Sequence, residues 1–467
     1  MNPELLHHFQ SKQLSIEERI AIGKDLRKKF PRINQGEYNE SADRTDPVSI
    51  LEAQGKTRLP DLVPIRYARM LTSPFAFLRG AAAIMAMDLQ ANGETSGIQV
   101  QACGDMHVAN FGVFASAERN LIFGINDFDE TLPGPWEWDL KRLVASIVAS
   151  GRFLGADKDL SEESVMAAVS TYRKKMKEFA YMGNMELWYS TIRDKDIMKT
   201  LSPSARKGAA KIMSKAKERT HMQVLGKLTD IVDDKFRLKV NAPFIVRETH
   251  TQAGIPIDEA LGLFLESYFL SLADDRKALL QHYRIVDVAR KVVGVGSVGT
   301  RCWIIFLTGN NSDDPLFLQL KEAQPSVLEP YSSRSAYTNH GQRVVAGQRL
   351  IQAAPDIFLG WGELSGIHFY VRQLRDMKGG VEFDPEKVTI KNLPQYSSLC
   401  AWALALSHAK SGDAAMIAGY VGNSEELDEA MVRFAFAYAD QTERDYEALV
   451  AAAKSGRIKV AEAEMKD

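Results

Sequence analysis

The chain has few cysteines and no long hydrophobic run, and these absences exclude several classes of protein. Among its 467 residues only Cys103, Cys302 and Cys400 are cysteines, and they form no Cys-x-x-Cys pair. This argues against a structural zinc site and a disulfide scaffold, and it favours a reducing compartment. No run of about eighteen apolar residues occurs, and the first residues lack the charged-then-apolar pattern of a signal peptide. We therefore expect a soluble, cytoplasmic protein without a membrane span.

An excess of charge of one sign is also lacking. The 58 Lys and Arg residues are balanced by 60 Asp and Glu residues, and the net charge is -2. Proteins with an obligatory nucleic-acid partner usually carry a clustered basic excess, so the balance argues against such a partner. The chain is longer than one hydrophobic core usually supports, and two or three subdomains are expected. The sequence contains no signal that defines the oligomeric state.

Polar residues at a defined spacing lie between apolar runs in the first third of the chain. Asp105 and Asn110 are five positions apart, and Asp127 and Asp129 follow a second apolar run. In phosphoryl transfer one carboxylate orients or deprotonates the attacking hydroxyl, and other oxygen ligands hold Mg2+ against the nucleotide phosphates. The spacing predicts Asp105 as the base, with Asn110, Asp127 and Asp129 as metal ligands. Because Asp often caps turns, a purely structural role is the alternative.

The local context supports the catalytic interpretation. Residues 98–102 are predicted to form a strand that leads into the loop, and residues 111–114 and 121–125 a hairpin around a polar tip. The acidic residues then lie at strand ends.

A second group of candidate residues lies in residues 292–299. Gly294, Gly296 and Gly299 form a Gly-x-Gly-x-x-Gly pattern that includes Ser297. The following residues, 300–307, are β-branched and aromatic, which predicts a strand. A dinucleotide-binding turn needs a helix at that point, whereas a kinase-type loop joins two antiparallel strands and folds over phosphates. We therefore expect these four residues to bind a nucleotide.

Lys321 lies in a predicted third strand, residues 315–323, and would direct its ammonium group toward the α- and β-phosphates. A surface lysine is the alternative. The helix expected at residues 340–353 has no acidic residue that could pair with Lys321. Glu329 is the nearest candidate partner, although its Ser-x-x-Glu context also fits a capping box. Gln342 and Gln348 are neutral substitutes.

Residues 104–110 and 125–127 resemble the catalytic loop and metal segment of the aminoglycoside-phosphotransferase branch of the protein-kinase-like superfamily. More closely, the chain resembles an uncharacterised bacterial domain-of-unknown-function family, whose recurring sequence motifs occur from about residue 45 onward. The kinase-like resemblance implies ATP and Mg2+ as cofactors. It also implies that Asp139 braces the catalytic loop by accepting backbone N–H groups, with His107 as a second supporting residue.

The order of the motifs is reversed relative to ordinary kinases, in which the glycine loop precedes the catalytic loop. The resemblance therefore implies an α+β, protein-kinase-like fold of two lobes that is circularly permuted and has extra helices. We expect an N-terminal helix and linker (1–47), a mostly helical lobe (48–283), a small β-rich nucleotide-binding lobe (284–378) and C-terminal helices on the large lobe (379–467). A shared site predicts that Lys321 and Asp127 converge. Two unrelated domains with chance motifs are the alternative.

The expected function is transfer of a phosphoryl group from ATP to an unknown acceptor, either a small molecule or a protein. Three alternatives remain open: a nucleotidyltransferase, a nucleotide-binding pseudokinase that regulates a partner, and a metallophosphoesterase. The last would use Asp105, His107 and Asp127 as metal ligands, because Gly-Asp-x-His also opens the motif of that class.

Overall fold

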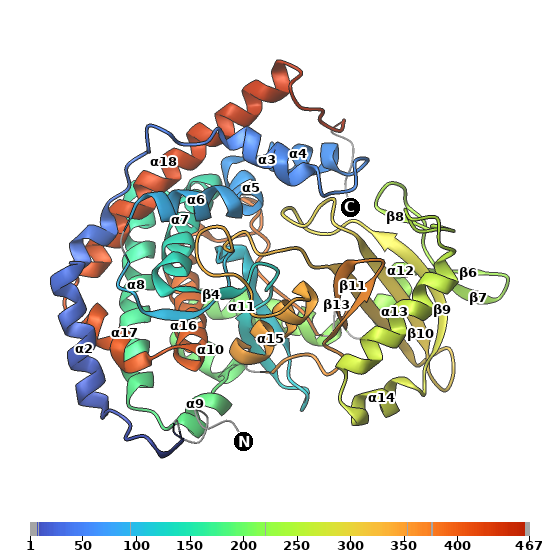
Figure 1. Ribbon diagram of the computed structural model, residues 1–467, viewed down its shortest axis with the longest axis horizontal. Helices are drawn as coiled ribbons and strands as arrows, with labels where there is room; N and C mark the ends of the chain where they lie inside the picture. Colours follow the sequence, from blue (N-terminus) through green and yellow to red (C-terminus); the bar gives the residue numbers. More distant parts are fainter. Residues whose placement is uncertain are drawn as a thin grey trace.

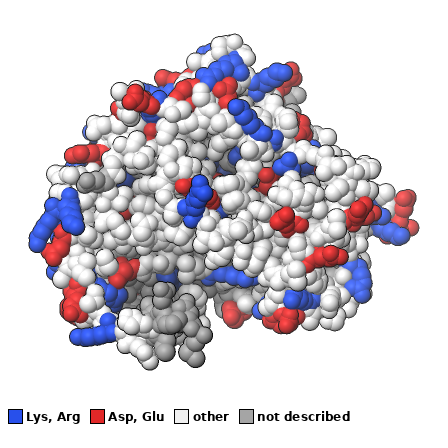
Figure 2. Space-filling view, viewed as in Figure 1, with Lys and Arg blue, Asp and Glu red and all other residues white. Residues whose placement is uncertain are grey.

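The computed structural model of the protein describes residue 7 and residues 9–93, 95–219, 221–352, 354–374 and 377–462. The protein is a mixed α and β structure with a helical body on one side and a six-stranded sheet on the other (Figure 1). Within those ranges no helix has both the length and the apolar character needed to cross a bilayer. On the face seen in Figure 2, basic and acidic side chains are interspersed, without a broad region of one sign.

The body is built from the N-terminal and C-terminal parts of the chain together. It contains α2 (Ile16–Lys29), η1 (Arg32–Gly36), α3 (Pro47–Gly55), α4 (Val63–Met70), α5 (Pro74–Gly80), α6 (Ala82–Ala91), η2 (Val108–Asn110), α7 (Trp136–Leu154), α8 (Lys158–Ala180), α9 (Asn184–Tyr189), α10 (Asp194–Thr200), α11 (Pro203–Glu218), η3 (Ile390–Asn392), α16 (Leu393–Ser411), α17 (Ala414–Val421) and α18 (Glu426–Lys454).

Helix α7 is the centre of the body, as its apolar sequence predicts. Almost every residue between Trp136 and Leu154 is buried, which is typical of a helix that is hydrophobic on most faces. Helices α8, α16 and α18 pack against it, and the Trp136 ring stacks on Tyr172 with a centroid distance of 5.6 Å. The C-terminal helices α16 and α18 therefore pack on the helices of the body.

The segment before α3 is held against the body by two buried ion pairs of one arginine. The Arg44 guanidinium lies 2.7 Å from Asp88 in α6 and 2.6 Å from Asp445 in α18, and all three side chains are almost fully buried. The residues expected as a linker therefore pack on the body.

Short strands within the body flank the loops that contain Asp105 and Asp127. Strands β1 (Gln99–Ala102) and β4 (Leu132–Pro135) pair antiparallel. The predicted hairpin is formed by β2 (Phe111–Ala115) and β3 (Leu121–Ile125), and β5 (Ile192–Arg193) adds to its edge. Because Ala102 at the end of β1 pairs with Leu132 at the start of β4, the loop that leaves β1 lies beside the segment that leads from β3 into β4.

The sheet follows the order β12-β13-β11-β10-β9-β8, with antiparallel pairing throughout. Its strands are β8 (Ile245–Val246), β9 (Arg284–Lys291), β10 (Cys302–Thr308), β11 (Pro315–Glu322), β12 (Gly360–Leu364) and β13 (Ile367–Gln373). The small hairpin β6 (Thr229–Val232) and β7 (Lys235–Leu238) and the helices α12 (His221–Leu228), α13 (Ile257–Ser271), α14 (Asp274–Leu280) and α15 (His340–Ile351) accompany it.

Helices cover both faces of the sheet. On β10, Ile305 belongs to the core cluster that contains Phe264 of α13, whereas Ile304 and Phe306 belong to the cluster that contains Leu225 of α12. This alternation is the two-residue period of a strand. The structure therefore places residues 221–283 with the sheet, whereas the sequence prediction placed them in the helical lobe. The sequence analysis expected this region to be mostly helical, and it predicted neither the strands β6, β7 and β8 nor the pairing of β8 with β9.

Candidate active site

The register of the β2–β3 hairpin brings two of the predicted site residues together. Phe111 pairs with Ile125, and the next residues continue the contact, because the Asn126 backbone N–H donates to the Asn110 carbonyl at 2.8 Å. Asp127 follows directly. The Asn110 side-chain N–H donates to the Asp105 carbonyl at 2.7 Å, so its amide oxygen is the end left for a ligand.

Asp139 fixes the loop that carries Asp105. Its two carboxylate oxygens accept the backbone N–H groups of Cys103 at 2.7 Å and Gly104 at 2.9 Å. His408 of α16 lies 3.4 Å from the same carboxylate, with both side chains buried. Gly104 has a φ of 78°, a conformation that favours glycine. Asp139 thus accepts two backbone N–H groups of this loop, the contact that the kinase-like resemblance implied, and it holds the loop in place.

The Asp105 carboxylate is held in place by a cation from α7. The Nε atom of Arg142 donates to its Oδ1 at 2.7 Å, while the same guanidinium donates to the Leu78 carbonyl at 2.8 Å. Burial raises the pKa of Asp105, and Arg142 opposes that increase. The carboxylate is therefore oriented and has a proton affinity above the usual one for Asp.

His107 is a buried, uncharged neighbour of Asp105. Its Nε2 atom lies 3.8 Å from the Asp105 carboxylate, and its Nδ1 atom has no hydrogen-bond partner within the described part of the chain. Burial, together with Arg79 and Arg142, lowers the pKa of the imidazole well below its usual value. A supporting role near Asp105 is consistent with this placement.

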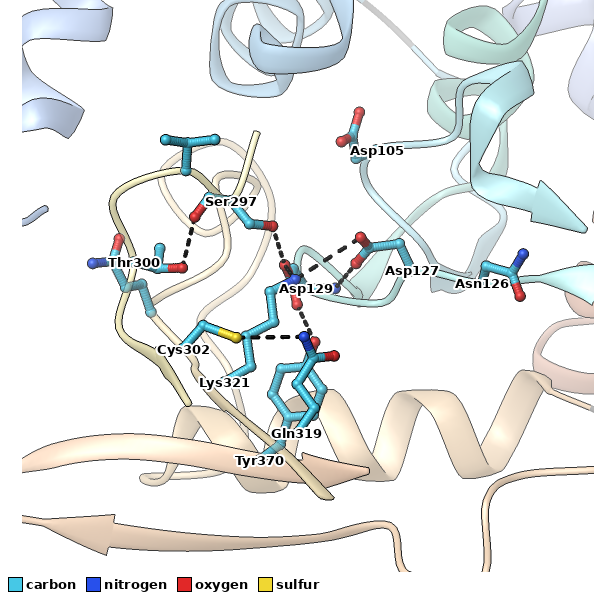
Figure 3. A network of polar contacts seen from close by, with 12 residues as sticks. Asp105, Asn126, Asp127, Asp129, Ser297, Thr300, Cys302, Gln319, Lys321 and Tyr370 are labelled. Carbon is cyan, nitrogen blue, oxygen red and sulfur yellow. Dashed lines mark hydrogen bonds and ion pairs between the residues drawn. The ribbon is translucent and has the colours of Figure 1, made fainter. Parts of the chain in front are cut away.

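Lys321 reaches the acidic segment from the sheet, as a shared site requires. On β11 it pairs with Cys302 of β10 and with Tyr370 of β13, so it comes from the middle of the sheet. Its ammonium group contacts the Asp129 carboxylate and lies 4.0 Å from that of Asp127 (Figure 3). The predicted convergence of Lys321 and Asp127 is confirmed.

The charges in this cluster stabilise one another. The Tyr370 hydroxyl donates to Asp129 at 2.7 Å, and the Asp127 carboxylate accepts the Asp129 backbone N–H at 3.2 Å. Burial alone would lower the pKa of Lys321, but Asp127 and Asp129 raise it above its usual value. Burial alone would raise the pKa of Asp129, but Lys321 lowers it. Both groups remain charged at neutral pH.

The glycine-rich segment joins β9 to β10, two antiparallel strands, as predicted. Gly294 and Gly299 have φ values of 67° and 93°, which L side chains rarely adopt. Gly296 lies against helix α5, because a Cβ there would lie 3.1 Å from the Arg79 carbonyl. The Ser297 hydroxyl donates to Asp129 at 3.2 Å (Figure 3). The loop therefore lies over the acidic segment.

The structure corrects the expected partner of Lys321. Asp129, which was also predicted as a metal ligand, is that partner, and the Glu329 carboxylate lies instead 3.4 Å from the Ser326 backbone nitrogen and 3.8 Å from His340. The alternative capping interpretation of Glu329 matches this position. Gln348 donates to Gln352 and does not contact Lys321.

Helix α15 contributes a cation to the site instead of an acid. The Arg343 guanidinium donates to the backbone carbonyl groups of Asp129 at 2.8 Å and Thr131 at 2.7 Å. The helix therefore holds the backbone of the acidic segment, and the segment itself supplies the carboxylate for Lys321. No signal in the sequence singled out Arg343, because its partners are main-chain oxygens that are distant along the chain.

Two cavities meet at this cluster, and Gly294 lines both. The larger, of about 1130 Å³, lies against the sheet and the chain that leaves β13, and its lining includes Asn126, Gln319 and Arg372. The smaller, of about 420 Å³, contains Asp105, Asn110, Asp127 and Asp129 in its lining. Arg372 donates to Gln319 at 2.9 Å and to the Asn126 carbonyl at 3.3 Å, and so it connects the sheet with the segment that follows β3.

The donor set for a cation consists of the Asn110 amide oxygen and the carboxylates of Asp127 and Asp129. Across the described ranges, no group of three His, Cys, Asp or Glu side chains is arranged to hold a metal ion by itself. Since Lys321 and Tyr370 already engage Asp129, Asn110 and Asp127 are the pair that remains best suited to a metal. Mg2+ is commonly held in this way, by one or two carboxylates together with substrate phosphates.

Comparison with known families gives one match. The model of a family described as "Uncharacterized protein conserved in bacteria (DUF2252)" matches residues 58–452. No curated protein and no solved structure is significantly similar to the chain. The matched range contains both the segment of Asp105 to Asp129 and the segment of Gly294 to Lys321, so a single family unit carries both halves of the site.

Proposed function

The chain belongs to the DUF2252 family, and we propose that it is an ATP- and Mg2+-dependent phosphotransferase. The observation that carries the proposal is the contact between Lys321, which follows a glycine-rich loop, and the acidic segment of Asp127 and Asp129. Phosphoryl transfer needs such a combination, because a cation and backbone N–H groups hold the phosphates while acids hold the metal. Two segments far apart in the sequence supply these groups at one place.

The two cavities suggest how donor and acceptor are arranged. ATP would lie in the larger cleft, with its phosphates reaching Gly294, where the cavities meet. Lys321 would hold the phosphates, and Asn110 and Asp127 would hold Mg2+, which neutralises the charge on the transferred group. The acceptor would enter the smaller cavity beside Asp105.

The reaction follows from these positions. Asp105 accepts the proton of the acceptor hydroxyl, the hydroxyl oxygen forms a bond to the γ-phosphorus, and the bond from that phosphorus to the β–γ bridging oxygen breaks. ADP leaves with the electron pair. Arg142 keeps the Asp105 carboxylate oriented, which reduces the entropy cost of reaching the reactive geometry.

The order of elements in the sheet lobe supports a permuted kinase-like architecture. Strand β9, the glycine loop, β10, the lysine strand β11, helix α15 and the strands β12 and β13 follow one another along the chain. The catalytic loop precedes them all. Chemistry depends on the arrangement in space and not on chain order, so permutation is compatible with activity.

The competing metallophosphoesterase is less well supported. Its metal ligands would include Asp105, yet Arg142 occupies that carboxylate with a hydrogen bond of 2.7 Å. His107 would have to bind a metal cation at a position that Arg79 and Arg142 make electropositive.

Turnover with labelled ATP tests the proposal. The wild type should release or transfer the γ-phosphoryl label in a Mg2+-dependent reaction, and Asp105→Asn and Asp127→Asn should each lose at least about a hundredfold, the usual scale for general-base and metal groups. Asp313→Asn makes the same change at an exposed position in the β10–β11 loop and serves as the control. Transfer of the α-label would indicate nucleotidyl transfer. ATP binding without turnover would favour a pseudokinase, and metal-dependent ester cleavage without nucleotide would favour the phosphoesterase.

A further inference from the structure

The smaller cavity contains a group of arginines that the phosphotransfer machinery does not use. Arg58, Arg66 and Arg79 all line it, on the same 420 Å³ space as Asp105. They come from the region of α3, α4 and α5, the helices that precede the catalytic loop. Arg66 is almost completely buried. Three guanidinium groups at one enclosed cavity require an explanation, because buried cations are costly unless paired.

The acids near the three arginines act on them only at longer range, Asp105 on Arg79 and Glu130 on Arg58 and Arg66. Within the described ranges no Asp or Glu carboxylate forms an ion pair with them, and the partners that they do have are neutral. Arg66 donates to the Gln54 side-chain oxygen at 2.8 Å and to the Gly80 carbonyl at 3.0 Å, and Arg58 donates to the Val298 carbonyl. The Nε atoms of all three, and one terminal nitrogen of Arg66, are buried without a hydrogen-bond partner.

The acids that share the cavity are already engaged elsewhere. Asp105 pairs with Arg142, Asp129 with Lys321, and Glu322 with Arg301 at 3.0 Å. Glu130 accepts the Val327 backbone N–H at 2.8 Å, and burial raises its pKa to about 7. Burial also lowers the pKa of each of the three guanidinium groups. Asp127, which also lines the cavity, lies 4.0 Å from Lys321. The three guanidinium groups therefore have no ion-pair partner among the acids of this cavity.

We infer that the acceptor of the proposed reaction is a small anionic molecule whose phosphate or carboxylate group binds to Arg58, Arg66 and Arg79 while its hydroxyl group lies at Asp105. The inference rests on the proposed function for the role of the ligand as acceptor, but the anion site itself does not depend on it. A guanidinium group matches the oxygens of phosphate and carboxylate groups with two parallel hydrogen bonds. A cavity of 420 Å³ is in the size range of small-molecule sites.

The Gln54→Glu variant tests the site without removing any arginine. The new carboxylate would lie where the Gln54 oxygen now accepts from Arg66, and it would neutralise that guanidinium with little change in shape. The variant should fold, and its own ion pair should preserve or raise its melting temperature. Gln90→Glu makes the same change of charge at an exposed position of α6 and is the matched control. Arg79→Gln is a second variant that removes one cation directly.

The probes are inorganic phosphate and malonate, titrated by calorimetry and by thermal shift with and without saturating ADP and Mg2+. Wild type and Gln90→Glu should bind at least one probe in both conditions, and Gln54→Glu and Arg79→Gln should lose about tenfold or more in affinity, the scale of one charge-assisted hydrogen bond. Preference for phosphate or for malonate identifies the anionic group. Equal binding by wild type and Gln54→Glu, or no binding to wild type, overturns the inference. Anion binding of the expected pattern without any ATP binding would instead overturn the proposed function alone.

Discussion

The contact between Lys321 and Asp129 should be the strongest side-chain coupling between the two halves of the site. Only 3% of the Lys321 side chain and 25% of the Asp129 side chain are exposed. Removing one member of such a pair leaves an uncompensated charge and typically costs about 3–5 kcal/mol. Lys321→Met additionally leaves Asp127 and Asp129 without the ammonium group between them, although the more distant Arg372 still acts on both. We expect Lys321→Met to destabilise the fold by that amount.

The second carboxylate contributes less to stability. At the 4.0 Å that separates Lys321 from Asp127, an effective dielectric constant near 20 gives about 4 kcal/mol. The Asp127 side chain is 35% exposed, and solvent screening reduces this to about 1 kcal/mol or less. A double-mutant cycle of Lys321→Met with Asp129→Asn should therefore give a coupling energy of about 2–4 kcal/mol. The cycle with Asp127→Asn should give about 1 kcal/mol.

Urea unfolding followed by tryptophan fluorescence measures these couplings, since the chain has six tryptophans. The control cycle uses Lys277→Met and Asp274→Asn, an ion pair of 2.9 Å on the surface of α14, for which solvent screening leaves little or no coupling. A Lys321–Asp129 coupling no larger than the control value would refute the account of a buried pair joining the two lobes.

Three further predictions concern the groups around this pair. Burial raises the pKa of Glu130 from 4.5 to about 7, so its contribution to stability is full below about pH 4.5, declines as the pH rises and is lost by about pH 7. Glu130→Gln should remove this decline, which is at most about 3 kcal/mol, in unfolding free energies measured between about pH 4.5 and 7. Asp139→Asn should lower the free energy of unfolding by about 2–3 kcal/mol and reduce turnover, because the NH2 group of the new amide would face a backbone N–H donor. An unchanged melting temperature would contradict the bracing role. Arg142→Met should move the acidic limb of the pH–rate profile to higher pH, since Arg142 opposes the raised pKa of Asp105, and an unmoved limb would argue against Asp105 as the base.

Local pattern was sufficient to predict the parts of the site that depend on neighbouring residues. The β2–β3 hairpin, the strands that flank the glycine loop and the position of Lys321 on a third strand all follow from alternation and turn residues that lie close together in the sequence. The mixed α and β class followed from the same patterns.

The parts that the sequence did not predict depend on contacts between distant segments. Glu329 was a reasonable partner for Lys321 by proximity along the chain, but Asp129 reaches the ammonium group through the fold. Arg343 and Arg142 bind carbonyl groups and a carboxylate of remote segments, so no spacing identifies them. The position of residues 221–283 beside the sheet likewise rests on pairing between β8 and β9, which a two-residue strand does not signal.

The central claim is that one nucleotide lies between the glycine loop and the acidic segment. Crystallography of the protein with Mn2+ and a non-hydrolysable ATP analogue tests it directly, because Mn2+ is located by its anomalous scattering. The account predicts a metal ion bound by Asn110 and Asp127, with the phosphates between that ion, Lys321 and residues 294–299. Nucleotide and metal bound outside these two cavities, or a metal ion that binds without any contact to Asp127, would contradict it.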